Sequence, residues 1–131
     1  MAFGEVHNVC VNLTNGTLAV GTSNVVAFFV PTDAVGGGIT VTKVGYASND
    51  AIAAASAPVF TCVSLGTNSA INGTIATSTG SVAWTAGTLK AGTLSTTFID
   101  AGYGVAFTRI QTAVNGDIPV VTGFVQYLMG R

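Results

Sequence analysis

The stretch Tyr103-Gly-Val-Ala-Phe-Thr-Arg-Ile110 decides the fold class, because its side chains alternate along the chain. Tyr103, Val105 and Phe107 fall on one side of an extended chain, and the small or polar residues between them fall on the other. A period of two predicts a half-buried β-strand with one face on a core and one face in water. Residues 39–46 repeat the same alternation.

Strand-favouring residues continue outward from this stretch over the whole chain. Val, Ile and Thr make up a third of the 131 residues, and Gly-rich segments separate short runs of them. Many short strands with turn signals between them are typical of a sandwich or barrel. The sequence therefore predicts a single all-β domain over residues 1–131, an antiparallel β-sandwich that is jelly-roll-like and has at most one short helix. The expected strands cover residues 5–13, 17–21, 24–30, 39–47, 58–65, 70–77, 81–85, 93–99, 103–110 and 118–129.

One short segment and three dipeptides complete the predicted elements. Asp50–Ala57 forms either two turns of helix, ended by Pro58, or a loop of small residues, and both alternatives stay open. The dipeptides are Asn-Gly, the sequence that two-residue type I′ turns prefer. We therefore expect hairpin turns at residues 15–16, 72–73 and 115–116.

Two of the predicted strands are apolar on both faces. In residues 24–30, alternation places Val25, Ala27 and Phe29 opposite Val26, Phe28 and Val30. In the last strand, it places Val120, Phe124 and Leu128 opposite Val121, Val125, Tyr127 and Met129. A strand that is apolar on both faces needs a second cover in a two-layer protein. That cover is either a loop or the short helix of the same chain, or another subunit.

Charged residues are rare, and this excludes several classes of protein. Nine of the 131 residues are charged, or 7%, against about a quarter in ordinary domains. The hydrophobic share of 49% and the net charge of −1 exclude intrinsic disorder. The surface is either coated with uncharged polar residues or covered by copies of the chain or by a partner. The basic residues are too few for a nucleic-acid-binding surface: Lys43, Lys90, Arg109 and Arg131.

No residues form a catalytic or metal-binding motif, so we expect no enzyme activity, no cofactor and no metal. His7 is the only histidine and no Gly-x-Ser-x-Gly motif is present, so we interpret it as an ordinary strand residue. Gly36–Gly38 precedes a predicted strand and does not open a helix, which excludes a phosphate-binding loop. A loop-bound Ca²⁺ remains an alternative. The acidic residues are far apart and beside turn signals: Glu5, Asp33, Asp50, Asp100 and Asp117.

The cysteines and the apolar segments bear on the compartment. Cys10 and Cys62 lie in apolar runs, so we expect two buried, reduced thiols, with a disulfide as the alternative. The N-terminus lacks the basic and apolar regions of a secretory signal. The longest strongly apolar run, Val25–Val30, is far shorter than the roughly 20 residues of a membrane helix. We therefore expect a chain made in the cytoplasm, with no membrane partner.

The end of the chain resembles a known class of viral proteins. Thr97-Phe-Ile-Asp-Ala-Gly-Tyr-Gly-Val-Ala-Phe-Thr-Arg-Ile110 is a strand, a turn with glycine and a strand, and Ile118-Pro-Val-Val-Thr-Gly-Phe-Val-Gln-Tyr-Leu-Met-Gly-Arg131 follows it. This ending is similar to the last strands of small β-sandwich proteins of tailed-bacteriophage virions, most of all the head decoration (cement) proteins. The resemblance implies a structural protein of the capsid surface that is assembled in the host cytoplasm. The partners it implies are further copies of the same chain, in a homotrimer, and the major capsid protein.

Open sheet edges also favour an oligomer. Soluble monomers protect such edges with Lys, Pro or bulges, and two lysines and three prolines are few for that purpose. A symmetric oligomer would pair or cover the edges instead. The alternative function is a receptor- or glycan-binding tail-fibre tip, with exposed aromatic residues around Trp84 and Tyr103. Interface residues are predicted at both ends of the chain: Ala2, Phe3, Tyr127, Leu128, Met129 and Arg131.

Overall fold

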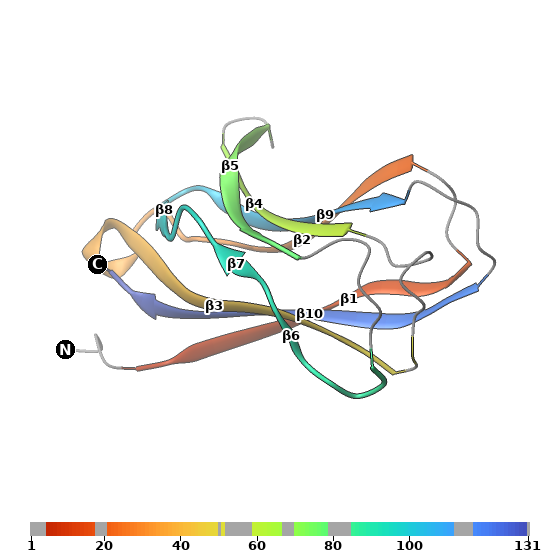
Figure 1. Cartoon of the computed structure of the whole chain (residues 1–131). Helices are drawn as coiled ribbons and strands as arrows, with labels where there is room; N and C mark the ends of the chain where they lie inside the picture. The colour runs from red at the N-terminus through yellow and green to blue at the C-terminus, as the bar shows by residue number, and fades with distance from the viewer. Residues whose placement is uncertain are drawn as a thin grey trace.

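Two antiparallel β-sheets face each other and enclose one core (Figure 1). The computed structural model describes residues 5–17, 21–49, 51, 59–66, 70–78, 85–111 and 117–130. The predicted all-β sandwich is confirmed. The only helical element among the described residues is the short 3-10 helix η1 (Val35–Gly37).

Each sheet has five strands. Sheet A has the order β1-β10-β3-β6, and β8 also pairs with β3. Sheet B has the order β2-β9-β4-β5-β7. The strands of sheet A are β1 (His7–Thr17), β10 (Asp117–Met129), β3 (Gly38–Ser48), β6 (Lys90–Ala91) and β8 (Phe98–Asp100). Those of sheet B are β2 (Gly21–Phe29), β9 (Gly104–Gln111), β4 (Val59–Leu65), β5 (Ile71–Thr77) and β7 (Thr93–Leu94).

The strand pairs are nested along the chain. The first strand pairs with the last, β2 pairs with β9, β3 pairs with β6 and β8, and β4 pairs with β5. Three further pairs, β10 with β3, β9 with β4 and β5 with β7, complete the two sheets. The chain therefore passes repeatedly from one sheet to the other.

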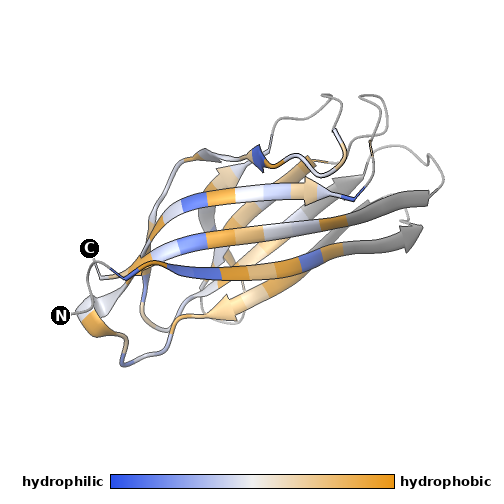
Figure 2. Ribbon diagram, turned by 90° about the horizontal axis from the view of Figure 1, so that it is seen from below, coloured by the Kyte–Doolittle hydropathy of each residue, from blue (hydrophilic) through white to orange (hydrophobic). Residues whose placement is uncertain are grey.

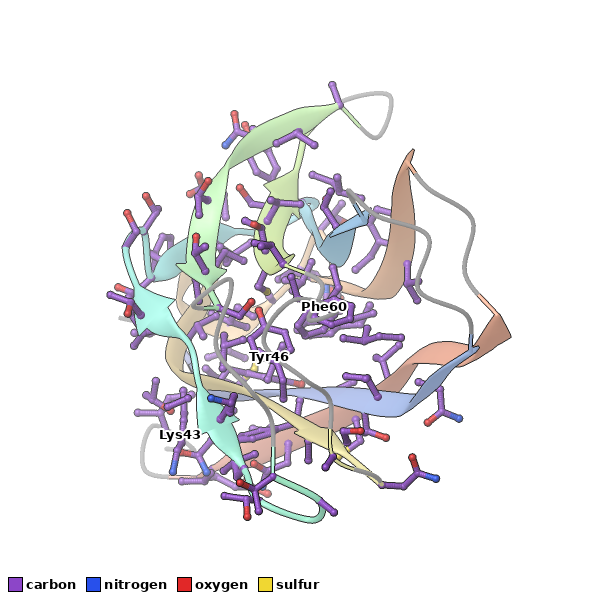
Figure 3. All side chains as sticks on the ribbon, turned by 45° about the vertical axis from the view of Figure 1, so that its right-hand side comes forward. Lys43, Tyr46 and Phe60 are labelled. Carbon is purple, nitrogen blue, oxygen red and sulfur yellow. The ribbon has the colours of Figure 1, made fainter. Side chains whose placement is uncertain are left out.

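Aromatic side chains fill the centre of the space between the sheets. Tyr46 of β3 stacks on Phe60 of β4 at 5.5 Å between ring centroids, and Phe107 of β9 meets Tyr46 edge-on at 5.7 Å. Figure 3 shows Tyr46 and Phe60 directed toward each other from opposite sheets. All three residues are buried, as predicted for Phe107.

Two strands depart from the predicted alternation. A register shift lies between Val26 and Phe28 of β2, so Phe28 packs toward the core while Val26 and Phe29 are exposed. The expected one-sided burial of residues 103–110 is wrong for residues 104–108, which are all buried. The reason is the position of β9 between β2 and β4, where neighbouring side chains cover its second face.

The Asn-Gly dipeptides at 15–16 and 72–73 do not form the predicted hairpin turns. Gly16 lies inside β1 and pairs with Ile118, and Gly73 lies inside β5 and pairs with Ser64. Both dipeptides sit at register shifts, so each belongs to a β-bulge inside a strand instead of a turn. The dipeptide at 115–116 lies outside the described residues, but the strands on either side of it, β9 and β10, belong to different sheets.

The expected strand at 93–99 is two strands in different sheets. Residues 93–94 pair with β5 and residues 98–100 pair with β3, so the chain crosses between the sheets in this segment. Most of three other predicted elements lies outside the described residues: the strand at 17–21, the helix or loop at 50–57 and the strand at 81–85.

Candidate interaction surface

The described side chains do not gather into a metal site. No group of three His, Cys, Asp or Glu residues able to hold a metal ion occurs in the part of the chain that the structure describes. His7 stacks on Tyr127 at 5.2 Å, and Tyr127 stacks on Phe28 at 5.3 Å. The only histidine thus belongs to an aromatic stack between the two sheets.

The two cysteines are free thiols in different environments. Cys62 is buried as predicted, and burial raises the pKa of its thiol from the ordinary 9.0 to about 12. Burial, and secondarily the nearby Cys62, raises the pKa of the Tyr46 phenol. The prediction that both thiols are buried is wrong for Cys10, which is exposed. Its strand forms the edge of sheet A, and Cys10 lies on the face directed away from the core.

An apolar row crosses the outer face of sheet B. Phe29 pairs with Gly104, Gly104 pairs with Leu65, and Leu65 pairs with Ile71, so these residues line up over β2, β9, β4 and β5. A side chain at Gly104 would overlap the Phe29 ring, whose atoms lie 2.7 Å and 2.9 Å from an ideal Cβ position. The Phe29 ring therefore occupies the space that a side chain at residue 104 would fill.

A second apolar row lies beside the first. Val26 pairs with Ala106, and Ala106 pairs with Val63. Val63 and Ala106 form a buried cluster with Leu65 that is separate from the main core. At the margins of the two rows the side chains are exposed: Val26 to 47%, Phe29 to 54% and Ile71 to 56%. We call these six residues, Val26, Phe29, Val63, Leu65, Ile71 and Ala106, the apolar face.

A row of threonines borders the apolar face. Thr108, Thr61, Thr77 and Thr93 pair in succession across β9, β4, β5 and β7. Threonine hydroxyls supply donors and acceptors without charge. The exposed apolar side chains Val26, Phe29 and Ile71, together with uncharged polar residues at their border, have the composition of a protein–protein interface core and rim.

On the outer face of sheet A, uncharged polar side chains lie beside the Phe124 ring, which covers Gly45. Gln126 of β10 donates through Nε2 to Asn8 Oδ1 of β1 at 3.3 Å and accepts from Thr42 Oγ1 of β3 at 3.2 Å. Thr122 Oγ1 donates to Asn12 Oδ1 at 3.3 Å. Uncharged side chains thus join neighbouring strands on this face.

The predicted interface residues occupy different positions in the fold. Tyr127 and Met129 are half-buried and pack against the core. Leu128, also half-buried, is the register partner of Thr40. Ala2, Phe3 and Arg131 lie outside the described residues. Contact of these residues with a partner stays a prediction.

The apolar face contains none of the residues predicted as interface. Its signal in the sequence was the strand at 24–30, which is apolar on both faces. Alternation alone could not identify the exposed residues, because the shift between Val26 and Phe28 reverses the order of the side chains beyond it. Of the aromatic residues predicted for glycan binding, Tyr103 is half-buried against the core and Trp84 lies outside the described residues.

Comparisons of the chain with protein-family models, with curated proteins and with solved structures found no match. Among the described residues, no helix has the length and apolar character needed to cross a bilayer.

Proposed function

We propose that the chain is a structural protein of a tailed-bacteriophage virion that binds to the surface of the assembled head. The nested strand pairs support a jelly-roll topology, because an antiparallel ribbon of paired strands, rolled up, gives two sheets of this order. Jelly rolls are frequent in viral capsid and lectin domains. The low share of charged residues, and the resemblance of the last strands to those of phage virion proteins, favour a viral capsid role over a lectin role.

The apolar face is the observation that carries this proposal. Phe29 and Ile71 stand at the two ends of one row and are each more than half exposed. Burying what remains exposed of each side chain would contribute about 1 kcal/mol. A partner with a broad, flat surface, such as a protein shell, could cover both ends of the row at once.

A head protein of this kind stabilises the shell by mass action. If it binds the assembled lattice and not the free capsid subunit, each bound copy shifts the equilibrium toward the intact shell. The major capsid protein is then the partner that the apolar face contacts, and the exposed Thr77 and Thr93 of the border provide hydrogen bonds at the rim.

The test is binding to purified phage heads that lack this protein. Added wild-type chain should co-sediment with intact heads and raise their melting temperature, and it should leave dissociated capsid subunits in the supernatant. The variants Phe29→Thr and Ile71→Thr should each weaken binding about fivefold, which corresponds to the loss of about 1 kcal/mol.

The control variant is Val35→Thr. Val35 is 62% exposed and lies in η1, outside both sheets, so this change removes a similar exposed apolar group away from the apolar face. It should bind heads like the wild type. Wild-type chain that stays in the supernatant and leaves the melting temperature unchanged would contradict the proposed function.

A further inference from the structure

The sheet edges differ in how well they are protected against pairing with another chain. Among the described residues, sheet A continues beyond β3 only in β6 and β8, which are two and three residues long, and sheet B ends in the two-residue β7. At its other end, sheet B has β2, which is interrupted by the shift between Val26 and Phe28. Short or bulged edge strands resist pairing. The remaining edge, β1, is eleven residues long, and its two register shifts follow Asn12, so its first half is uninterrupted.

The first half of β1 is regular, and no described strand pairs with its outer edge. Residues His7 to Asn12 pair one by one with Tyr127 to Thr122, and the first register shift follows Asn12. In the described part of the chain, β10 is the only strand that pairs with β1. The sequence of β1 contains no Lys, Arg, Asp, Glu or Pro. It therefore lacks the residues that usually protect such an edge.

Five residues of the regular part of β1 read the same in both directions. Residues 8–12 are Asn-Val-Cys-Val-Asn, a palindrome centred on Cys10. When two antiparallel copies of such a strand are centred on each other, every residue faces a residue of its own type. This is the self-complementarity that a two-fold interface requires, because the same surface meets itself.

The two faces of the palindrome have different environments. Asn8, Cys10 and Asn12 are exposed on the outer face of sheet A, and Val9 and Val11 are half-buried on the other face. Figure 2 shows β1 at the margin of sheet A, beside β10. A second strand at this edge would cover the exposed parts of both valines and satisfy the backbone groups that point away from β10.

We propose that two copies of the chain pair through β1, antiparallel, about a two-fold axis at Cys10. Val9 faces Val11 of the second copy, Asn8 faces Asn12 of the second copy, and the two Cys10 residues face each other. Both sheets A then form one continuous sheet across the dimer. No like charges meet, since the strand carries no Lys, Arg, Asp or Glu. This dimer differs from the homotrimer implied by the resemblance, and it does not depend on the proposed role in phage heads.

The axis at Cys10 can be tested by cross-linking. Facing residues of an antiparallel pair have Cα atoms about 4.5–5.5 Å apart, which a disulfide can bridge. Diamide, which takes two electrons and two protons from a pair of thiols, should therefore convert the wild type to a covalent dimer that Cys10→Ser does not form. Cys62 is buried and should not contribute.

Off-axis cysteines provide the matched control. In a Cys10→Ser background, Asn8→Cys alone places the two new thiols about 13 Å apart, four residues along the strand, and should cross-link poorly. The same holds for Asn12→Cys alone. Mixing the Asn8→Cys and Asn12→Cys chains should give a covalent heterodimer, because residue 8 faces residue 12 of the second copy. Equal cross-linking by every single variant would show random collision and overturn the proposal.

Charge variants test the pairing without cysteine chemistry. Asn8→Lys with Asn12→Lys places lysine opposite lysine twice and should weaken the dimer by about tenfold or more. Asn8→Lys with Asn12→Glu places opposite charges together twice and should stay dimeric. Circular dichroism checks that both variants are folded, and sedimentation velocity measures the mass. A wild type that sediments as a monomer or a trimer throughout a dilution series would overturn the proposal.

Discussion

Two side chains at the centre of the molecule, Tyr46 and Cys62, keep their protons because water does not reach them. Both are buried, and burial raises the pKa of each. A thiol that attacks or binds a metal does so as the thiolate, so Cys62 is a packing residue under ordinary conditions. Cys10 is the accessible thiol of the chain.

The raised pKa of Cys62 makes stability fall in alkaline solution. The folded state holds the thiol proton up to about pH 12, and the unfolded chain releases it near pH 9.0. Below pH 9 the contribution is complete, and it is lost as the pH rises toward 12. Urea unfolding should therefore show the wild type losing about 1.4 kcal/mol per pH unit above pH 9 relative to Cys62→Ala. Cys10→Ala, at an exposed position, should keep the wild-type dependence, and an identical slope in Cys62→Ala would contradict this account.

Pairing between whole strands overrides local sequence preferences in this fold. The period of two in residues 103–110 and 39–46 is a local property of a strand, and it predicts strands correctly there. The Asn-Gly dipeptides at 15–16 and 72–73 are also local signals, but they lie within β1 and β5, whose pairing continues past them. A bulge and a hairpin turn accept the same residues, and only the partner strand decides between them.

The apolar face could be predicted only in part, for the same reason. The sequence shows that residues 24–30 are apolar on both sides, which is sufficient to expect a second cover. It does not show that Phe29 aligns with Leu65 and Ile71, because their register depends on β9 between them. The palindrome at 8–12 is visible in the sequence, but its meaning requires knowing that β1 is an open edge.

The packing of the two sheets depends on a glycine in β10. Gly123 is buried, and a Cβ atom there would lie 2.9 Å from Leu13 Cδ1 and 3.0 Å from Phe107 Cζ. Phe107 belongs to β9 in the opposite sheet, so Gly123→Ala would force the sheets apart or displace both side chains. We expect a loss of about 1–3 kcal/mol in the free energy of unfolding, measured with urea.

Gly73→Ala is the matched control for this change. Gly73 also lies within a strand, but a Cβ there would meet only Ser64 Oγ, at an ordinary 3.7 Å. This variant should have a free energy of unfolding close to that of the wild type. Equal effects of the two substitutions would mean that loss of glycine flexibility, and not the contact with Phe107, sets the cost.

For the whole molecule, the two proposed surfaces are geometrically compatible. Two antiparallel strands in one sheet are related by an axis perpendicular to that sheet, so a dimer through β1 keeps both copies of sheet B on the same side. Both apolar faces then point in one direction, toward a single broad partner. A dimer would bind a protein shell through two sites, and the second contact would be intramolecular.

This arrangement predicts that disrupting the dimer weakens head binding without any change in the apolar face. The folded Asn8→Lys/Asn12→Lys variant should bind heads about tenfold or more weakly than Asn8→Lys/Asn12→Glu, because it loses the second contact. Phe29→Thr should also co-sediment less with heads, but it should remain a dimer in sedimentation velocity. Equal head binding by the two charge variants would mean that each copy binds alone, even if the dimer forms in solution.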